Sequence, residues 1–153
     1  MIDPQFDKLS QLHALALCLW AESRGEPVEG QIAVGCVIRN RVEHRGKSYK
    51  DIIFQPWQFS CFHPEGGESN YHATLAMAKR VNLLSSMQPE SDIRDPAWVQ
   101  CLFIAGGIIN GKLLDRTQGA EHYMTTALWL KAKPEWASTM RVACEIGHQV
   151  FLI

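Results

Sequence analysis

The chain has 153 residues, a formal net charge of −1 at pH 7, 46% hydrophobic residues and 20% charged residues. These are ordinary globular values, so we predict one domain over residues 1–153 and exclude a disordered or fibrous chain. Scattered basic residues argue against a nucleic-acid-binding protein, which needs clustered Lys and Arg. The nearest cluster is Arg39, Arg41 and Arg45, and it fits a solvated helix face better than a phosphate site.

Cysteine usage and the N-terminus bear on the cellular setting. The five cysteines at 18, 36, 61, 101 and 144 are widely spaced and form no CxxC pair, so we predict neither a zinc site nor a disulfide framework. Folding in a reducing cytoplasm fits best. Residues 1–7 lack the apolar core of a secretory signal, and the apolar run 14–21 is too short to span a membrane. We therefore expect no stable membrane association, and an extracytoplasmic target would need another route.

The first predicted helix begins at an Asp7 or Ser10 cap and ends near residues 23–25, with Gly25 as its C-terminal cap. Residues 15–20 are apolar on nearly every side, which predicts a central, buried helix. A second helix is expected from Pro27, with Ile32, Ala33, Cys36 and Val37 on its inner face. A short third helix is expected after a Ser48 cap.

Further elements follow along the chain. Pro56 forbids regular helix over residues 55–60. A helix capped by Ser69 or Asn70 should run to about residue 84, and residues 85–94 should form a polar loop. Asp95-Pro96 opens a strong helix that ends at 110–111. A helical turn near 134–136 and a hairpin of residues 141–145 with 149–153 complete a mainly α (α+β) fold with a small β element in the C-terminal third.

Glu22 breaks the pattern of the core, because a carboxylate directly follows an apolar helix at its C-terminal end. The helix dipole disfavours negative charge there, and partial burial also penalises the ionised form. A carboxyl group that holds its proton in this way suits general acid catalysis. The alternative is that Glu22 points to solvent or pairs with Arg24.

Several motifs together resemble the SleB-type cell-wall hydrolases, a family of spore cortex-lytic enzymes and phage endolysins. The run AESRGEPVEGQIAV at residues 21–34 resembles the family's opening motif, and Asn40-Arg41-Val42 continues it. Gln58-Phe59-Ser60 resembles the second motif, Asp115-x-Thr117-x-Gly119-Ala120 the third, and Ile146-Gly147-x-x-x-Phe151 the ending. After Tyr123 the family tends to have Asn-Pro, where this chain has Met124-Thr125-Thr126.

The resemblance implies a lysozyme-like domain similar to lytic transglycosylases, in which the catalytic Glu ends a buried helix and is often followed by Ser, as Glu22 and Ser23 are. It implies an enzyme that cleaves the β-1,4 bond between N-acetylmuramic acid and N-acetylglucosamine in peptidoglycan, with Glu22 catalytic and neither cofactor nor metal. We expect a monomeric phage endolysin, made in the host cytoplasm and admitted to the periplasmic cell wall by a holin-like pore.

Substrate-binding candidates come from the second and third motifs. Gln58 and Ser60 offer hydrogen bonds to sugar hydroxyl or acetamido groups, and Phe59 or its neighbour Trp57 offers a flat face, with one of the two expected in the core. The third motif and the residues after it supply three further substrate-binding candidates: Thr117, Glu121 and Tyr123. Glu121 is expected either in the cleft or as an exposed loop charge, and Glu26 either orients its loop or carries a second charge.

Alternative functions remain open at the level of sequence. Hydrolysis of the same bond by a muramidase would use Glu121 or Glu26 to activate water. A zinc amidase would need ligands such as His122, His148 and Glu22, which lack the usual spacing. A Cys–His peptidase built on Cys18 and a non-catalytic wall-binding module are weaker. The chain offers one well-placed carboxylate, which favours a transglycosylase because the substrate's own 6-hydroxyl can act as the nucleophile.

Overall fold

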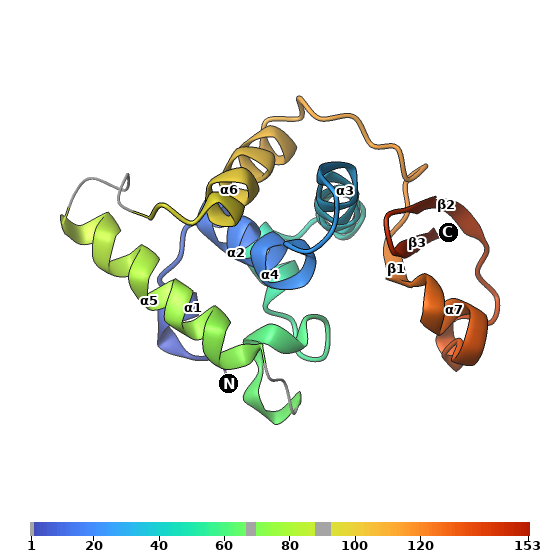
Figure 1. Ribbon diagram of the computed structural model, residues 1–153, viewed down its shortest axis with the longest axis horizontal. Coiled ribbons are helices and arrows are strands. Elements are labelled where there is room, and N and C mark those ends of the chain that lie inside the picture. The colour runs from blue at the N-terminus through green and yellow to red at the C-terminus, as the bar shows by residue number, and fades with distance from the viewer. Residues whose placement is uncertain (1, 67–69, 88–92) are drawn as a thin grey trace.

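The computed structural model describes residues 2–66, 70–87 and 93–153. Within them, helices form most of the chain and three short strands lie near its C-terminal end (Figure 1), which confirms the predicted fold class. The α-helices are α1 (Pro4–Asp7), α2 (Gln11–Ser23), α3 (Val28–Arg45), α4 (Tyr49–Ile53), α5 (Tyr71–Met87), α6 (Pro96–Ile109) and α7 (Thr126–Ala132). Short 3₁₀ helices are η1 (Ser60–Phe62), η2 (Pro64–Gly66) and η4 (Glu135–Ala137).

Helix α2 lies at the centre of the helical part of the molecule, in contact with α3, α4, α5 and α6 (Figure 1). Ser10 caps it by accepting a hydrogen bond from the backbone N–H of His13. Every residue from Ala14 to Trp20 is buried, as the apolar sequence predicted. A helix that is apolar all round needs neighbours on every side, and the surrounding helices supply them.

Local signals placed most other helix starts correctly. Ser48 caps α4, and Asp95 caps α6 with Pro96 in its first turn. Sequence analysis missed α1, which Asp3 caps. The predicted cap at Gly25 is wrong: α2 ends at Ser23, and its C-cap residue is Arg24, whose guanidinium donates to the backbone oxygens of the last turn.

The C-terminal sheet is antiparallel, with strand order β1-β3-β2. Strands β2 (Val142–Ile146) and β3 (Gln149–Leu152) form the predicted hairpin, and Gly147 in its turn has a φ of +60° that favours glycine. Strand β1 (His122–Thr125) was not predicted; it pairs with β3 across more than twenty residues. With α7 and η4, the sheet forms a small second core of Met124, Ala137, Val150 and Leu152.

Two predicted boundaries need comment. Residues 85–87 continue α5 rather than opening a loop, while residues 88–92 of that loop and the predicted cap Ser69 lie outside the described residues. Within the described ranges, no helix has the length and apolar character needed to cross a bilayer.

Candidate active site

Glu22 lies in the last turn of α2 and is partly buried. Neighbouring side chains hydrogen-bond the last carbonyl groups of this helix: the buried Ser23 donates its hydroxyl to the carbonyl oxygen of Leu19 at 2.8 Å. Arg24 donates to the carbonyl oxygen of Trp20 at 2.8 Å and lies 4.1 Å from the centre of that indole. A rigid, capped helix end therefore presents the Glu22 carboxyl group at the edge of the core.

A cavity of about 550 Å³ lies against this helix end. Four separate segments supply its walls: the end of α2, helix α3, the turn before η1, and residues 122–140. Its lining residues are Glu22, Arg41, Trp57, Gln58, Phe59, His122, Tyr123, Trp136 and Met140. Among these described lining residues, Glu22 is the only carboxylate, and aromatic rings make up much of the rest.

Tyr123 reaches Glu22 from the opposite wall. Its hydroxyl donates to Glu22 Oε2 at 3.4 Å, while its ring packs on Phe151, with centroids 5.9 Å apart. Burial, followed by the negative charge of Glu22, raises the pKa of Tyr123 well above its ordinary value. The phenol therefore stays protonated over the working pH range and acts as a hydrogen-bond donor to the carboxylate.

Arg41 joins the two walls of the cavity. It is only 6% exposed, so its assignment to a solvated helix face was wrong. Its Nε donates to the carbonyl oxygen of Glu121 at 2.7 Å, and its Nη1 donates to Gln58 Oε1 at 3.3 Å. Burial lowers the pKa of Arg41, against the opposing effect of Tyr123. Its position within Asn40-Arg41-Val42 was the sequence signal that pointed to a special role.

The loop before β1 is held by Asp115. Thr117 donates to Asp115 Oδ1 from its backbone N–H at 2.7 Å and from its hydroxyl at 2.6 Å. Asn40 and Gly119 donate to Asp115 Oδ2 at 2.9 and 3.0 Å. Burial acts to raise the pKa of Asp115, but these hydrogen bonds outweigh it and hold the pKa below its ordinary value. The third motif thus shapes the loop that delivers Tyr123.

The structure brings some predicted site residues together and separates others. Gln58, Phe59 and Tyr123 line the cavity with Glu22. Ser60 is exposed on η1 and is not among the lining residues, and Thr117 is fully buried in its loop. Of the two candidate flat faces, Phe59 belongs to the core at 3% exposure, whereas Trp57 is 82% exposed.

The two further carboxylates lie outside this cavity. Glu121 Oε2 lies 2.9 Å from His44 Nδ1, and its Oε1 lies 3.7 Å from Arg45 Nε, beside a separate depression. Glu26 binds the β2–β3 turn: the backbone N–H of His148 donates to its Oε1 at 2.8 Å, and His148 Nδ1 lies 2.8 Å from its Oε2. Both side chains hold the fold around the cavity rather than facing it.

Sequence analysis did not place Trp136 or Met140 in the site, and it considered His122 only as a zinc ligand, yet all three line the cavity. The His122 ring lies 5.4 Å from the Trp136 ring, tilted by 40°. Burial and then the charge of Arg41 lower the pKa of His122, so the imidazole is neutral at neutral pH. The sequence predicted only the helical turn at 134–136. It did not predict that this turn packs against β1, because that contact joins residues that are not neighbours in the sequence.

The described residues were also compared with the requirements of a metal centre. Within them, no group of three or more His, Cys, Asp or Glu side chains is arranged to hold a metal ion. Among the ligands considered for a zinc amidase, His148 is bound to Glu26 and His122 lies beside Trp136.

Comparison with known proteins places this geometry in context. A family model described as Cell Wall Hydrolase matches residues 25–152, beginning three residues after Glu22, and it confirms the family predicted from the motifs. No curated protein matches the chain. The catalytic domain of the germination-specific lytic transglycosylase SleB from Bacillus anthracis has the same fold, with a TM-score of 0.63, 23% identity, and coverage of 96% of this chain and 98% of that one. The catalytic domain of the Bacillus cereus SleB protein gives a TM-score of 0.57, 24% identity, and coverage of 100% and 93%.

Proposed function

The chain belongs to the cell wall hydrolase family, and on that premise we propose that it cleaves the β-1,4 bond between N-acetylmuramic acid and N-acetylglucosamine. As a member of this family it is a peptidoglycan-cleaving enzyme. We assign the catalytic role to Glu22 and the reaction type to lytic transglycosylation. The observation that carries this proposal is a single carboxylate, Glu22, in an aromatic-lined cavity that Tyr123 closes from the other side.

One carboxyl group is enough for this reaction. Glu22 first donates its proton to the leaving glycosidic oxygen. The 6-hydroxyl of the N-acetylmuramic acid then attacks its own anomeric carbon, while the Glu22 carboxylate removes the hydroxyl proton. Because the attack is intramolecular, it gains the advantage of proximity, with effective molarities of roughly 10⁵ M or more in well-oriented cases. The product is a 1,6-anhydromuramoyl end, and water takes no part.

Tyr123 and Arg41 suit the carboxylate stage of this cycle. The Tyr123 hydroxyl donates to Glu22 Oε2, so it fixes the carboxyl orientation and stabilises the carboxylate once the proton has left. The Arg41 guanidinium lines the same cavity and adds positive charge where negative charge develops. Neither group competes as an acid, because the pKa of Tyr123 is raised and arginine stays charged.

A hydrolysing muramidase is the second candidate, and the positions of the other carboxylates argue against it. Glycoside hydrolysis ordinarily uses two carboxyl groups that face each other across the scissile bond. Glu26 is bound to His148, and Glu121 is paired with His44 and Arg45 outside the cavity. The similar B. anthracis protein is a lytic transglycosylase, which supports the same choice.

Mass spectrometry of digested peptidoglycan tests the reaction type. Transglycosylation should yield anhydro ends, one water or about 18 Da lighter than reducing ends, as internal attack requires. Reducing ends alone would establish hydrolysis and leave Glu22 as the acid. Loss of activity in EDTA that zinc restores would instead favour the amidase.

We also propose a phage endolysin that folds in the host cytoplasm and reaches the periplasmic wall through a holin-like pore. Support comes from the thiols: Cys18, Cys36 and Cys101 are free and buried, as a reducing compartment allows. Burial raises the pKa of Cys36 and Cys101 to about 11, so both thiols are poor nucleophiles. Expression with and without a holin tests the route, because lysis without the pore would contradict it.

A further inference from the structure

Trp57 has a strained backbone. Its φ is +67°, in the left-handed region that glycine occupies readily and a bulky residue does not. Among the described non-glycine residues, Gln118 alone shares a positive φ, and its side chain donates to the carbonyl oxygen of Ala143 at 3.2 Å. A strained residue persists where the surroundings require it, and this often marks a functional position.

The turn around Trp57 explains the strain locally. The backbone N–H of Gln58 donates to the carbonyl oxygen of Gln55 at 3.2 Å, which closes a four-residue turn. Pro56 occupies the second position and Trp57 the third. A turn with proline second and a positive φ third follows the type II pattern, which selects glycine or asparagine at the third position. Tryptophan is therefore an unfavourable residue for this turn.

Packing gives no compensation for that strain. The Trp57 side chain is 82% exposed, while Phe59, two residues later, is 3% exposed and already anchors the segment to the core. An indole left almost entirely in water contributes little burial energy to folding. Its exposed ring instead lines the cavity that holds Glu22.

A second indole lines the same cavity from a different part of the chain. Trp136 in η4 is 51% exposed and lies against His122 of β1. Exposed tryptophan faces offer large, rigid, apolar surfaces, with which the apolar faces of pyranose rings can pack. Two such faces on separate segments suit a polymer that passes the Glu22 carboxyl group.

We propose that Trp57 is a glycan-binding platform, whose indole packs against a sugar ring of the peptidoglycan strand and acts with Trp136 to hold that strand beside Glu22. This rests on the proposed function, since the strand is its substrate. Trp57 contacts no reacting bond in this role, so its removal should weaken substrate binding more than it slows the chemical step.

The test compares Trp57→Gly, Trp57→Tyr and Phe103→Ala. Phe103 is a matched control, because it is an aromatic residue on α6 with 81% exposure and is not among the cavity-lining residues. Binding to insoluble peptidoglycan is measured in the Glu22→Gln background. KM and kcat on soluble glycan strands, together with Tm, are measured in the active enzyme.

Trp57→Gly should weaken binding and raise KM roughly three- to tenfold, as expected for a lost aromatic contact, with kcat changed less. Its Tm should equal or exceed that of the parent, because glycine accepts the positive φ. Trp57→Tyr should retain most of the binding, and Phe103→Ala should match the parent throughout.

The inference is overturned if Trp57→Gly leaves both binding and KM unchanged, or if its binding loss accompanies a lower Tm that Trp57→Tyr does not correct. The proposed function fails separately, and the inference with it, if the parent neither binds nor cleaves peptidoglycan. If the parent cleaves peptidoglycan and Trp57→Gly has an unchanged KM, the role of Trp57 is contradicted while the proposed function stands.

Discussion

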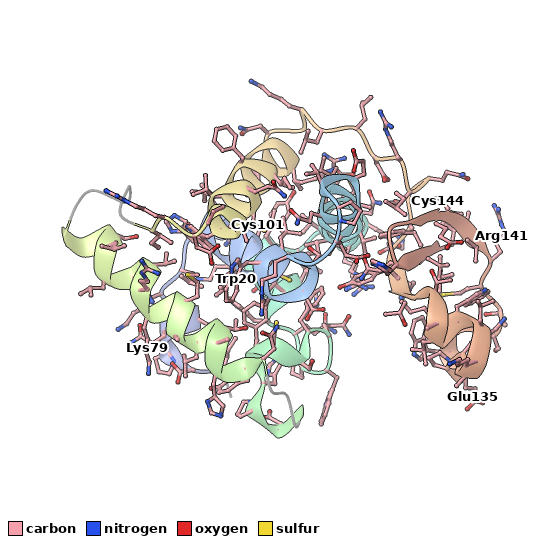
Figure 2. The ribbon with its side chains drawn as sticks, in the orientation of Figure 1. Trp20, Lys79, Cys101, Glu135, Arg141 and Cys144 are labelled. Atoms are coloured by element: carbon pink, nitrogen blue, oxygen red, sulfur yellow. The ribbon has the colours of Figure 1, made fainter. Side chains whose placement is uncertain are left out.

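The two walls of the cavity that holds Glu22 are held in place by different combinations of interactions. The helical body of α1 to α6 presents Glu22 from the end of a helix in which residues 14–20 are all buried. The C-terminal wall, residues 115–153, has a small core of its own, and it joins the helical body both by packing Ala120 and Phe151 into the main core and by polar contacts. Figure 2 shows this division: Trp20 and Cys101 lie among packed helices, whereas Glu135, Arg141 and Cys144 belong to the outlying C-terminal wall.

Several polar links help to hold the C-terminal wall in place. Asn40 binds Asp115, Arg41 binds the carbonyl oxygen of Glu121, and Glu26 binds His148. Burial in the helical body sets the position of the acid without directional bonds, whereas these links to the C-terminal wall depend on the direction of each donor and acceptor. The position of the acid is therefore fixed by burial, while the shape of the site depends on the packing of Phe151 and on directional hydrogen bonds together.

The largest effect is expected at the acid itself. Glu22→Gln keeps the shape of the side chain but removes the transferable proton, so wall-lytic activity should fall by about a hundredfold or more. Tm should remain close to that of the parent, because the helical body does not depend on this carboxyl group. Turbidity loss of cell walls and a thermal melt measure the two quantities. Retention of tens of per cent of the activity would assign the acid to another residue.

Arg41→Met tests the link that joins both walls. The substitution keeps the apolar stem but leaves the buried carbonyl oxygen of Glu121 and Gln58 Oε1 without their donor. We expect a loss of about 2 kcal/mol in the free energy of unfolding and a clear fall in activity. Denaturant unfolding and lytic assays check this.

Arg39→Met is the matched control for that prediction. Arg39 lies on the same helix and donates to the carbonyl oxygen of Leu113, away from the cavity that contains Glu22. It should lose stability without a comparable loss of activity per folded molecule. Equal activity in the two variants would show that the Arg41 link does not shape the site.

The same contrast explains what the sequence could predict. Helices α2, α4 and α6 were predictable because caps and apolar patterns are local, and Glu22 was predictable because it follows such a pattern. Strand β1 has four residues with no clear alternation, and it forms only by pairing with β3. The burial of Arg41 depends on acceptors 17 and 80 residues away, which helical spacing does not reveal.

Acid should weaken the loop that carries the third motif. The folded-state pKa of Asp115 is lowered, so its contribution to stability is present above the pKa of an unfolded aspartate and is lost as pH falls through the folded value. Asp115→Asn should be less stable than the parent at neutral pH, with the difference shrinking toward about pH 3 and below. Thermal melts across that range measure it, and a difference that stays constant with pH would contradict the assignment.

The smallest effect is expected at Glu26, which anchors the β2–β3 turn from the helical body. Glu26→Gln keeps an oxygen for the backbone N–H of His148 but loses the charge that faces its imidazole. His148 is largely exposed, so solvent screens this pair, and we expect a loss of only about 0.5 kcal/mol. Because the lost carboxylate carries a full negative charge, the loss should shrink at high salt. The free energy of unfolding of the parent and of Glu26→Gln, measured at low and at high salt, tests this dependence. If Glu26→Gln instead abolished activity while the protein stayed folded, Glu26 would have to act on the substrate. Glu26 would then be the second carboxylate that a hydrolysing muramidase requires.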